Sequence, residues 1–379
     1  MTQGTTVVLF IILLVFVSCT PSEESTYDSL SASEIELSRL FTISDEDLPD
    51  DMLFGTINQL LVSQTGELLI VDTQLKAIHL FDPDGTYLSS EIGEGEGPGE
   101  VRQIGTVSIS GDNNLLLYDW SQRRMSQYVL ENDAAAKLRH LRDMTPEFYP
   151  QNFHISPNGD MFCLIHPSPV DGEDATITLQ RINQEGEPIG DAAFKFDKNE
   201  VVEFRNEAGQ MMATTSSPHH KRVILYLHEE KLIIGNSTAI GFEIYNLESG
   251  ERVDSATFRR PDLTLSNSEK RDFIESMAER MGLEGMQVST LISQMPETRG
   301  KVRMMNYDPE NQLVWLNLVS DDETTVPEWI AVSESGELTG QISNELAGPV
   351  LQYSDGRIYV LAESDRGEQV VDVMGYNLN

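Results

Sequence analysis

The sequence predicts an all-β fold, a six-bladed β-propeller, and three observations predict it. A turn followed by an apolar strand recurs six times along the chain, at intervals of roughly 45 to 80 residues. Each unit divides into four short strands with Gly, Asn or Asp turns between them, and such sheets repeated radially are propeller blades. The last unit, 350–379, supplies only three strands, while a strand-like segment stands upstream at 34–43. We therefore expect this N-terminal strand to complete the last blade and cover its edge.

The repeated unit is clearest in its first two copies. An apolar strand ends at Asp72 in the first copy and at Asp119 in the second. The first unit predicts strands at 59–62, 68–71, 77–81 and 87–92. The same turn and strand recur at 158–164, 230–235, 311–316 and 355–360.

One segment, 266–298, interrupts the β rhythm between the fourth and fifth units. Ser266 and Glu269 form a capping box, apolar residues follow at helical spacing, and Gly282 can end the helix. The segment is therefore predicted to be a helical insertion. Two roles stay open for it: it covers the apolar faces of the propeller, or it offers an adaptable contact surface of methionines. Those methionines are Met277, Met281, Met286 and Met295.

The N-terminus has the composition of an export signal. The apolar run Val7–Val17 is shorter than the roughly 20 residues that span a bilayer, which favours a signal peptide over residues 1–18. The stretch from Phe16 to Cys19 resembles a lipobox, and the resemblance implies that Cys19 carries the lipid. Residues 19–33 are then a flexible tether and 34–379 the propeller. The alternative is an uncleaved anchor with an incidental cysteine.

The net charge of the chain limits the classes of partner that it can bind. The chain has 62 acidic and 26 basic residues, a net charge of −36. So acidic a surface repels phosphate backbones, which excludes nucleic acid as a partner, and it disfavours direct docking on anionic lipid headgroups. The expected membrane contact is the lipid anchor alone. The second cysteine, Cys163, lies in an apolar run and is expected to be a buried packing residue without a disulfide.

Residues 69–73, 78–82, 84–85 and 95–100 resemble one NHL repeat. The whole chain is similar to six-bladed β-propeller lipoproteins common in Bacteroidota-like bacteria, and residues ~57–130 match the repeat best. The resemblance implies a monomeric propeller in the cell envelope, held by lipid in the outer membrane at its periplasmic or outer surface. It does not imply an activity, because propellers include hydrolases, lyases, receptors and scaffolds.

Two motifs that could carry chemistry are better explained as turns. The glycines of 93–100 lack the dinucleotide-binding spacing, and its glutamates would repel phosphate, so it is expected to be a tight connection between blades. The segment 82–85 has two carboxylates but lacks the further ligands of a calcium loop, and Asp-Pro-Asp-Gly is typical of a β-turn.

The expected function is therefore a binding or scaffold module for a protein, a glycan or a small ligand. The alternative is a hydrolase or lyase with a metal near the propeller axis, although no metal-binding motif, cofactor or catalytic residue can be named from the scattered histidines. A metal analysis of the protein would separate the two.

The long links 93–100, 199–220 and 266–298 each join an outer strand to the next inner strand, so they should gather on one face. We expect the ligand there. The candidate contacts are Arg123, Arg124, Asp72 and Asp119, of which both aspartates can instead fix turns.

Overall fold

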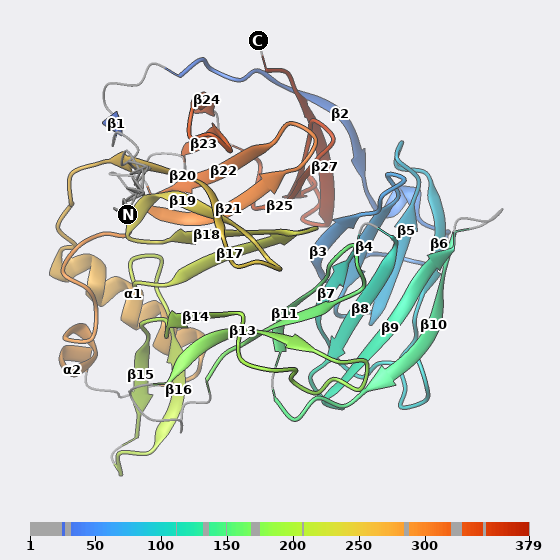
Figure 1. Ribbon diagram of the computed structural model, residues 1–379, viewed down its shortest axis with the longest axis horizontal. Coiled ribbons are helices and arrows are strands. Elements are labelled where there is room, and N and C mark those ends of the chain that lie inside the picture. Colours follow the sequence, from blue (N-terminus) through green and yellow to red (C-terminus); the bar gives the residue numbers. More distant parts are fainter. Residues whose placement is uncertain are drawn as a thin grey trace, which may run out of the picture.

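The computed structural model describes residues 25–26, 32–110, 112–131, 136–148, 150–167, 175–206, 208–283, 288–319, 328–343 and 346–378. Six four-stranded antiparallel arrays are arranged radially, as Figure 1 shows, and the six-bladed β-propeller predicted from the sequence is confirmed. In each blade the first strand along the chain lies innermost, except that the sixth blade takes its outer strand from the N-terminal segment.

The first three blades follow the chain without interruption. Blade 1 consists of β3 (Ile57–Val62), β4 (Leu68–Asp72), β5 (Ala77–Phe81) and β6 (Tyr87–Glu91). Blade 2 consists of β7 (Ile104–Ile109), β8 (Asn114–Asp119), β9 (Arg124–Glu131) and β10 (Lys137–Met144). Blade 3 consists of β11 (Pro150–Ile155), β12 (Met161–Ile165), β13 (Thr176–Ile182) and β14 (Phe194–Asp197).

The next three blades include the chain closure. Blade 4 consists of β17 (Val223–His228), β18 (Lys231–Asn236), β19 (Ala239–Asn246) and β20 (Arg252–Arg259). Blade 5 consists of β21 (Val302–Asp308), β22 (Leu313–Leu318), β23 (Glu328–Ser333) and β24 (Leu338–Ile342). Blade 6 consists of β25 (Val350–Ser354), β26 (Arg357–Glu363), β27 (Gln369–Tyr376) and β2 (Leu37–Ile43).

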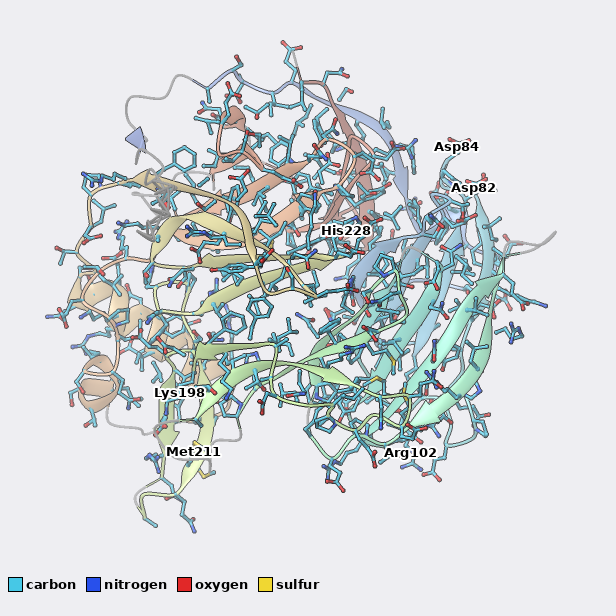
Figure 2. All side chains as sticks on the ribbon, viewed as in Figure 1. Asp82, Asp84, Arg102, Lys198, Met211 and His228 are labelled. Atoms are coloured by element: carbon cyan, nitrogen blue, oxygen red, sulfur yellow. The ribbon has the colours of Figure 1, made fainter. Side chains whose placement is uncertain are left out.

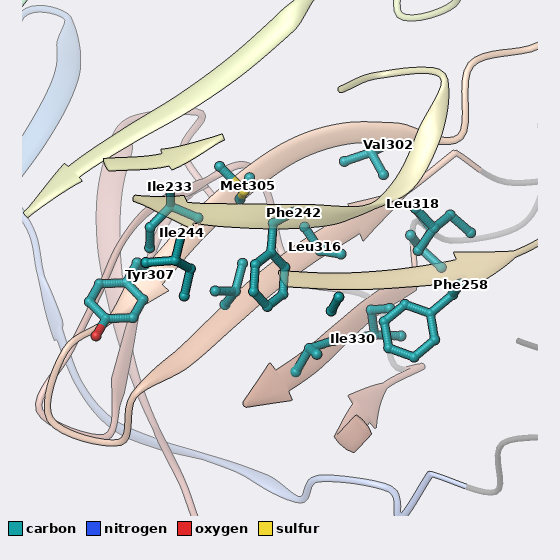
Figure 3. Packing of buried hydrophobic residues seen from close by; sticks show 14 residues of the cluster. Ile233, Phe242, Ile244, Phe258, Val302, Met305, Tyr307, Leu316, Leu318 and Ile330 are labelled. Atoms are coloured by element: carbon teal, nitrogen blue, oxygen red, sulfur yellow. The ribbon is translucent and has the colours of Figure 1, made fainter. Parts of the chain in front are cut away.

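Strand periodicity explains why the second strands are apolar throughout. Successive side chains point to opposite faces of a sheet, and both faces of a blade are buried against neighbours. In β4, Leu69 and Val71 pack toward blade 2, whereas Leu68 and Ile70 pack toward blade 6. Six such apolar clusters occur, one at each junction between blades, so the ring is closed. Figure 3 shows the cluster between blades 4 and 5.

The closure of blade 6 is also confirmed. Strand β2 pairs antiparallel with β27, in a register that places Leu37 opposite Tyr376. The segment before β2 touches two more blades. The short strand β1 (Ser25–Thr26) pairs in parallel with β20, and Gln341 donates its backbone N–H to the carbonyl of Ser33. The described parts of the predicted tether are therefore attached to the outer strands of blades 4 and 5.

The helical insertion is present between blades 4 and 5, as predicted. Helix α1 (Asn267–Arg280) begins with the Ser266–Glu269 capping box, and Gly282 follows it with a φ of 64°. A second short helix, α2, spans Val288–Ile292. Both helices pack on a hairpin that the sequence did not predict, β15 (Val202–Arg205) and β16 (Met211–Thr215). Figure 1 shows this helix–hairpin unit beside β14 and β17.

The methionines of the insertion have a packing role. Met295 is buried, and Met277 and Met281 lie against the same apolar cluster, which Phe204 of β15 also joins. The adaptable methionine surface considered from the sequence is therefore absent at these three residues. Met286 lies outside the described residues.

The two faces of the ring differ in their connections. The face from which the inner strands start carries the links 93–100, 199–220 and 266–298, and we call it the long-link face. The opposite face, where the inner strands end, carries short turns such as 82–86 and 156–160, and we call it the turn face. The three long links are thus outer-to-inner connections, as the sequence predicted.

Candidate functional site

A cavity of about 490 Å³ lies on the propeller axis. Its volume is within the range of small-ligand pockets, about 300 to 1,000 Å³. All six blades contribute to its wall, mainly through the ends of the inner strands. The polar wall residues are Gln59, Ser63, Gln64, Ser108, Ser110, Asn152, His154, Tyr226, His228, Glu229, Glu310, Gln352 and Ser354.

The cavity lies toward the turn face. Gln64, Glu229 and Glu310 follow the ends of three inner strands, and all three side chains are exposed. The sequence predicts a ligand site on the long-link face. The axial cavity lies at the opposite end of the ring from that predicted site. In Figure 2, His228 marks the central position of the wall.

The wall is held in place by hydrogen bonds between different blades. The side chain of Gln59 donates to the backbone carbonyl of Val107 at 2.8 Å. Gln352 donates to the hydroxyl of Tyr226 at 3.2 Å, which links blade 6 to blade 4. These bonds fix amide and hydroxyl groups before any ligand arrives, which lowers the entropic cost of binding.

A histidine spans the junction between blades 3 and 4. His154 Nε2 donates to the carbonyl oxygen of Glu229 at 2.7 Å. Burial lowers the pKa of His154, and burial also lowers the pKa of His228. Both imidazoles are therefore neutral at pH 7, and the Nδ1 atom of His154 is left as an acceptor.

Two acidic residues adjoin each other behind the turn-face mouth. Asp308 is fully buried, and its carboxylate accepts hydrogen bonds from Tyr376 and from the Asn311 amide, the latter at 2.8 Å. Burial raises the pKa of Asp308 to about 6, and the neighbouring carboxylate of Glu310 acts in the same direction. Proton uptake by Asp308 can therefore change the charge beside the cavity in mildly acidic conditions.

The two aspartates predicted from the repeat lie away from this cavity. The carboxylate of Asp72 is fully buried and accepts the backbone N–H groups of Gly55 at 2.6 Å, Thr56 at 3.1 Å and Leu75 at 2.8 Å. Burial alone would raise the pKa of Asp72, but the neighbouring His79 imidazole and these backbone donors hold it well below its usual value. Asp72 therefore ties the entry of its inner strand to the turn after its second strand.

Asp119 does the same in blade 2. Its carboxylate accepts the N–H of Arg102 at 2.6 Å, and the N–H groups of Ser121 and Gln122 at 2.8 Å and 2.9 Å. Burial opposes ionisation, yet these bonds keep the pKa of Asp119 below its ordinary value. The geometry gives both aspartates a structural role, and the ligand contact named for them stays a prediction.

The two arginines lie on the long-link face. The Arg124 guanidinium donates to the carbonyls of Glu96 at 3.1 Å and Gly97 at 3.0 Å, and also to that of Glu100. It therefore holds the glycine-rich link closed. Arg123 is exposed in the same turn, with a φ of 52°. The structure thus brings Arg124 onto 93–100 and does not bring either arginine to the axial cavity.

Buried Asp72 and His79 lie close to the half-buried Ser90 in blade 1. His79 Nδ1 lies 2.7 Å from the hydroxyl oxygen of Ser90, while His79 Nε2 lies 3.8 Å from Asp72 Oδ2. The second distance exceeds hydrogen-bond range, and His79 has no exposed surface beneath the ring of Phe54. The group is therefore a packing arrangement inside the blade, without the access that a nucleophile needs.

The remaining predictions concern turns, metals and cysteines. Asp82 accepts the N–H groups of Asp84 and Thr86, which confirms the β-turn. Within the described ranges, no group of three or more His, Cys, Asp or Glu is arranged to hold a metal ion, and no helix is long and apolar enough to cross a membrane. Cys163 is buried and burial raises its pKa, as expected for a packing thiol. Cys19 lies outside the described residues.

Comparison with known proteins supports the fold. Residues 34–157 match a family described as a six-bladed β-propeller, DUF5128. The chain is similar to the crystal structure of a protein from Bacteroides fragilis that is described as exported, with a TM-score of 0.56 and 10% identity, over 94% of this chain and 98% of that one. The chain is also similar to a DUF4221 member from Bacteroides vulgatus, with a TM-score of 0.48 and 10% identity, over 92% of this chain and 100% of that one. No curated protein matches the chain.

Sequence reasoning missed the cavity residues for a physical reason. The wall combines short pieces of six strands, such as Asn152 and His154 of β11 with Glu229 after β17. No single piece has a recognisable spacing. The sequence offered only a weak signal for these wall residues. Polar residues interrupt the inner strands, whereas the second strands of the same blades are largely apolar.

Proposed function

We propose that this protein is a lipid-anchored envelope protein whose propeller binds a neutral, hydroxyl-rich ligand, such as a short glycan, in the axial cavity. The single observation that carries the proposal is the composition of that cavity. Amide, hydroxyl and imidazole groups from five of the six blades line a space of about 490 Å³, and blade 5 contributes Pro309 and Glu310. Groups that both donate and accept hydrogen bonds suit a ligand with the same property.

The charges on the wall of the axial cavity indicate which class of ligand it can bind. Glu229 and Glu310 are at the mouth, and no lysine or arginine of the described chain lines the cavity. Carboxylates accept hydrogen bonds from hydroxyl groups but repel anions, so the cavity favours neutral ligands over phosphates or acidic sugars. The ring of Tyr226 offers an apolar surface for the face of a sugar.

The proposed localisation to the cell envelope rests on the N-terminal sequence. The apolar run Val7–Val17, followed directly by Ser18-Cys19, supports export and acylation at Cys19. The Bacteroides fragilis protein of similar fold, which is described as exported, is consistent with this location. The polar residues that follow Cys19, from Thr20 to Glu24, have the composition of a tether that would join the lipid to the propeller.

The anchor is tested by Cys19→Ala with metabolic fatty-acid labelling. Acylation needs the thiol, so the variant should lose the label and appear as a soluble or unprocessed form. A label that persists in the variant contradicts the anchor.

The cavity is tested by calorimetric titration of the full chain in detergent with maltotetraose, cellotetraose and chitotetraose. We expect one of them to bind with one-to-one stoichiometry. Glu229→Gln removes a charged acceptor from the mouth and should weaken that binding by about ten-fold. Glu230→Gln is the matched control, because Glu230 is exposed beside it but does not line the cavity.

The control variant should change the affinity by less than about two-fold. Failure of all three saccharides to bind, or equal weakening by the two variants, contradicts the assignment of the cavity to neutral glycans.

A further inference from the structure

A second hollow lies outside the axis, between blades 3 and 4. It is a groove of about 540 Å³ bounded on one side by β14 and Lys198 and on the other by β18, β19 and β20. The segment 221–223, where β17 begins, forms its end on the long-link face. In Figure 2, Lys198 lies near the helix–hairpin unit and away from the central His228. The groove is therefore separate from the axial cavity.

The groove exists because small residues cover the facing side of blade 4. Gly241, Ser255 and Thr257 line it, whereas larger side chains fill the inner part of the same junction. Gly241 has no space for a side chain, since a Cβ atom there would meet the carbonyl oxygen of Ala256 at 2.2 Å. The two blades therefore pack tightly near the axis and leave an open space toward the rim.

The charge of this groove is opposite to that of the molecule. Of 379 residues, 18 line it, yet these include five of the 26 basic residues of the chain and only two acidic ones. Its net charge is thus +3 in a chain of net charge −36. The basic residues are Lys195, Lys198, Lys221, Arg222 and Arg252.

Two of the five cations have carboxylate partners. Lys221 Nζ lies 2.9 Å from Asp197, and Arg252 Nη1 lies 3.0 Å from Glu243. All four side chains are well exposed, so each pair contributes only about 0 to 1 kcal/mol and exchanges readily with another anion.

The other three cations have no carboxylate partner within the described chain. Lys195 and Lys198 are exposed, so their ammonium groups are available to a ligand. Arg222 donates to the carbonyl of Arg303, but its Nε atom is buried without a hydrogen-bond partner among the described residues. These three cations give the groove its excess of positive charge, which favours an anionic ligand.

We infer that this inter-blade groove binds an anionic oligosaccharide. The acidic molecule as a whole repels an anionic membrane surface, which disfavours lipid headgroups as the ligand. A single chain bearing carboxylate or sulfate groups can enter, place its anionic groups on Lys195, Lys198 and Arg222, and bond its hydroxyls to Ser255 and Thr257. The half-buried ring of Phe196 supplies an apolar surface beside the cations.

The test is a calorimetric titration of the full chain in detergent with two anionic probes, tetragalacturonate and a heparin-derived tetrasaccharide. The two probes distinguish carboxylate from sulfate as the preferred anion. Binding should weaken at least about five-fold between roughly 0.05 M and 0.5 M NaCl, since exposed charges are screened by salt. The variant K195E/K198E should weaken it by at least about ten-fold.

A matched control carries the same charge change elsewhere. K137E/R366E alters exposed residues of blades 2 and 6 and should leave the affinity within about two-fold. Circular dichroism on all three proteins ensures that folding is unchanged. Lack of binding by both probes, or equal weakening by the two double variants, overturns the inference. Neutral saccharides test the axial cavity and anionic saccharides test the groove. Failure of one proposal therefore leaves the other proposal unaffected.

Discussion

The hydroxyl of Thr42 donates a hydrogen bond of 2.6 Å to the carboxylate of Asp372, which follows it by 330 residues. Arg39 Nη2 lies 2.9 Å from the other carboxylate oxygen. The two ends of the chain are thus joined across blade 6 by side chains as well as by the backbone pairing of β2 with β27. The stability of the whole ring should depend on this junction, because an open blade would expose a strand edge and an apolar face.

Deleting residues 34–43 should destabilise the domain far more than deleting residues 21–33. The first deletion removes β2 and the apolar contacts of Ile43 with blade 1, whereas the second removes the short β1 pairing and the contact of Ser33 with blade 5. Thermal unfolding followed by circular dichroism checks this. Equal melting temperatures would contradict the closure argument.

A point substitution tests the same junction more finely. Asp372→Ala leaves the Thr42 hydroxyl without its acceptor inside a largely buried pair, which should cost about 1 to 3 kcal/mol of unfolding free energy. Asp372→Asn keeps an acceptor and loses only the ion pair with the exposed Arg39, so it should cost less than about 1 kcal/mol. Urea unfolding of the two variants measures both values, and a reversed order would refute the role given to Thr42.

Asp72→Asn should lower stability at pH 7 by about 1 to 3 kcal/mol, because the amide cannot accept all three backbone N–H groups with the strength of a carboxylate. The pKa of Asp72 is depressed in the folded protein, so its stabilisation is present above the unfolded pKa and is lost as the pH falls through the lower folded value. The difference between wild type and variant should therefore shrink below about pH 4. A constant difference from pH 7 to pH 3 would contradict this assignment.

Much of the ring could be predicted because its signals are local. The turn before each second strand, the unbroken apolar run within it, and the Ser266–Glu269 box each lie within a few residues, and all were found where expected. The closing strand was predictable for a different reason: the last unit lacked one strand, and a matching segment stood at 34–43.

The features that were not predicted are those built from distant segments. Hairpin β15–β16 sits in a long link, and its strands of four and five residues are too short for their alternation to stand out in the sequence. The groove cations Lys195, Lys221 and Arg252 belong to separate elements, and only the packing of blade 3 on blade 4 brings them together. The spacing of these residues along the chain therefore gives no indication that they line one groove.

Asp308→Asn should remove a pH dependence of stability between about pH 4 and pH 7. Burial raises the pKa of Asp308 to about 6, so the folded state holds this proton more tightly than the unfolded state does. Stability from this group is present below the unfolded pKa and is lost as the pH rises through about 6. At pH 7 the asparagine variant should be the more stable protein, by on the order of 2 kcal/mol.

Glu310→Gln offers an independent check on the same site, because the Glu310 carboxylate is one cause of the raised pKa of Asp308. This substitution should move the pH-dependent loss of stability toward lower pH without abolishing it. Melting temperatures measured from pH 4 to pH 7 compare the three proteins. Parallel curves for wild type and both variants would exclude Asp308 as the responsible group.

Arg124→Lys should loosen the link 93–100 even though it keeps the charge. The planar guanidinium reaches the carbonyls of Glu96, Gly97 and Glu100 at once, a geometry that a single ammonium group cannot reproduce. We expect a loss of about 1 to 3 kcal/mol in unfolding free energy and faster amide hydrogen exchange at Gly95 and Val101, whose N–H groups close the link. Arg102→Ala is the control, since it removes only an exposed ion pair with Glu96 and should cost less than about 1 kcal/mol. Equal exchange rates in wild type and Arg124→Lys would show that the link holds its shape without the arginine.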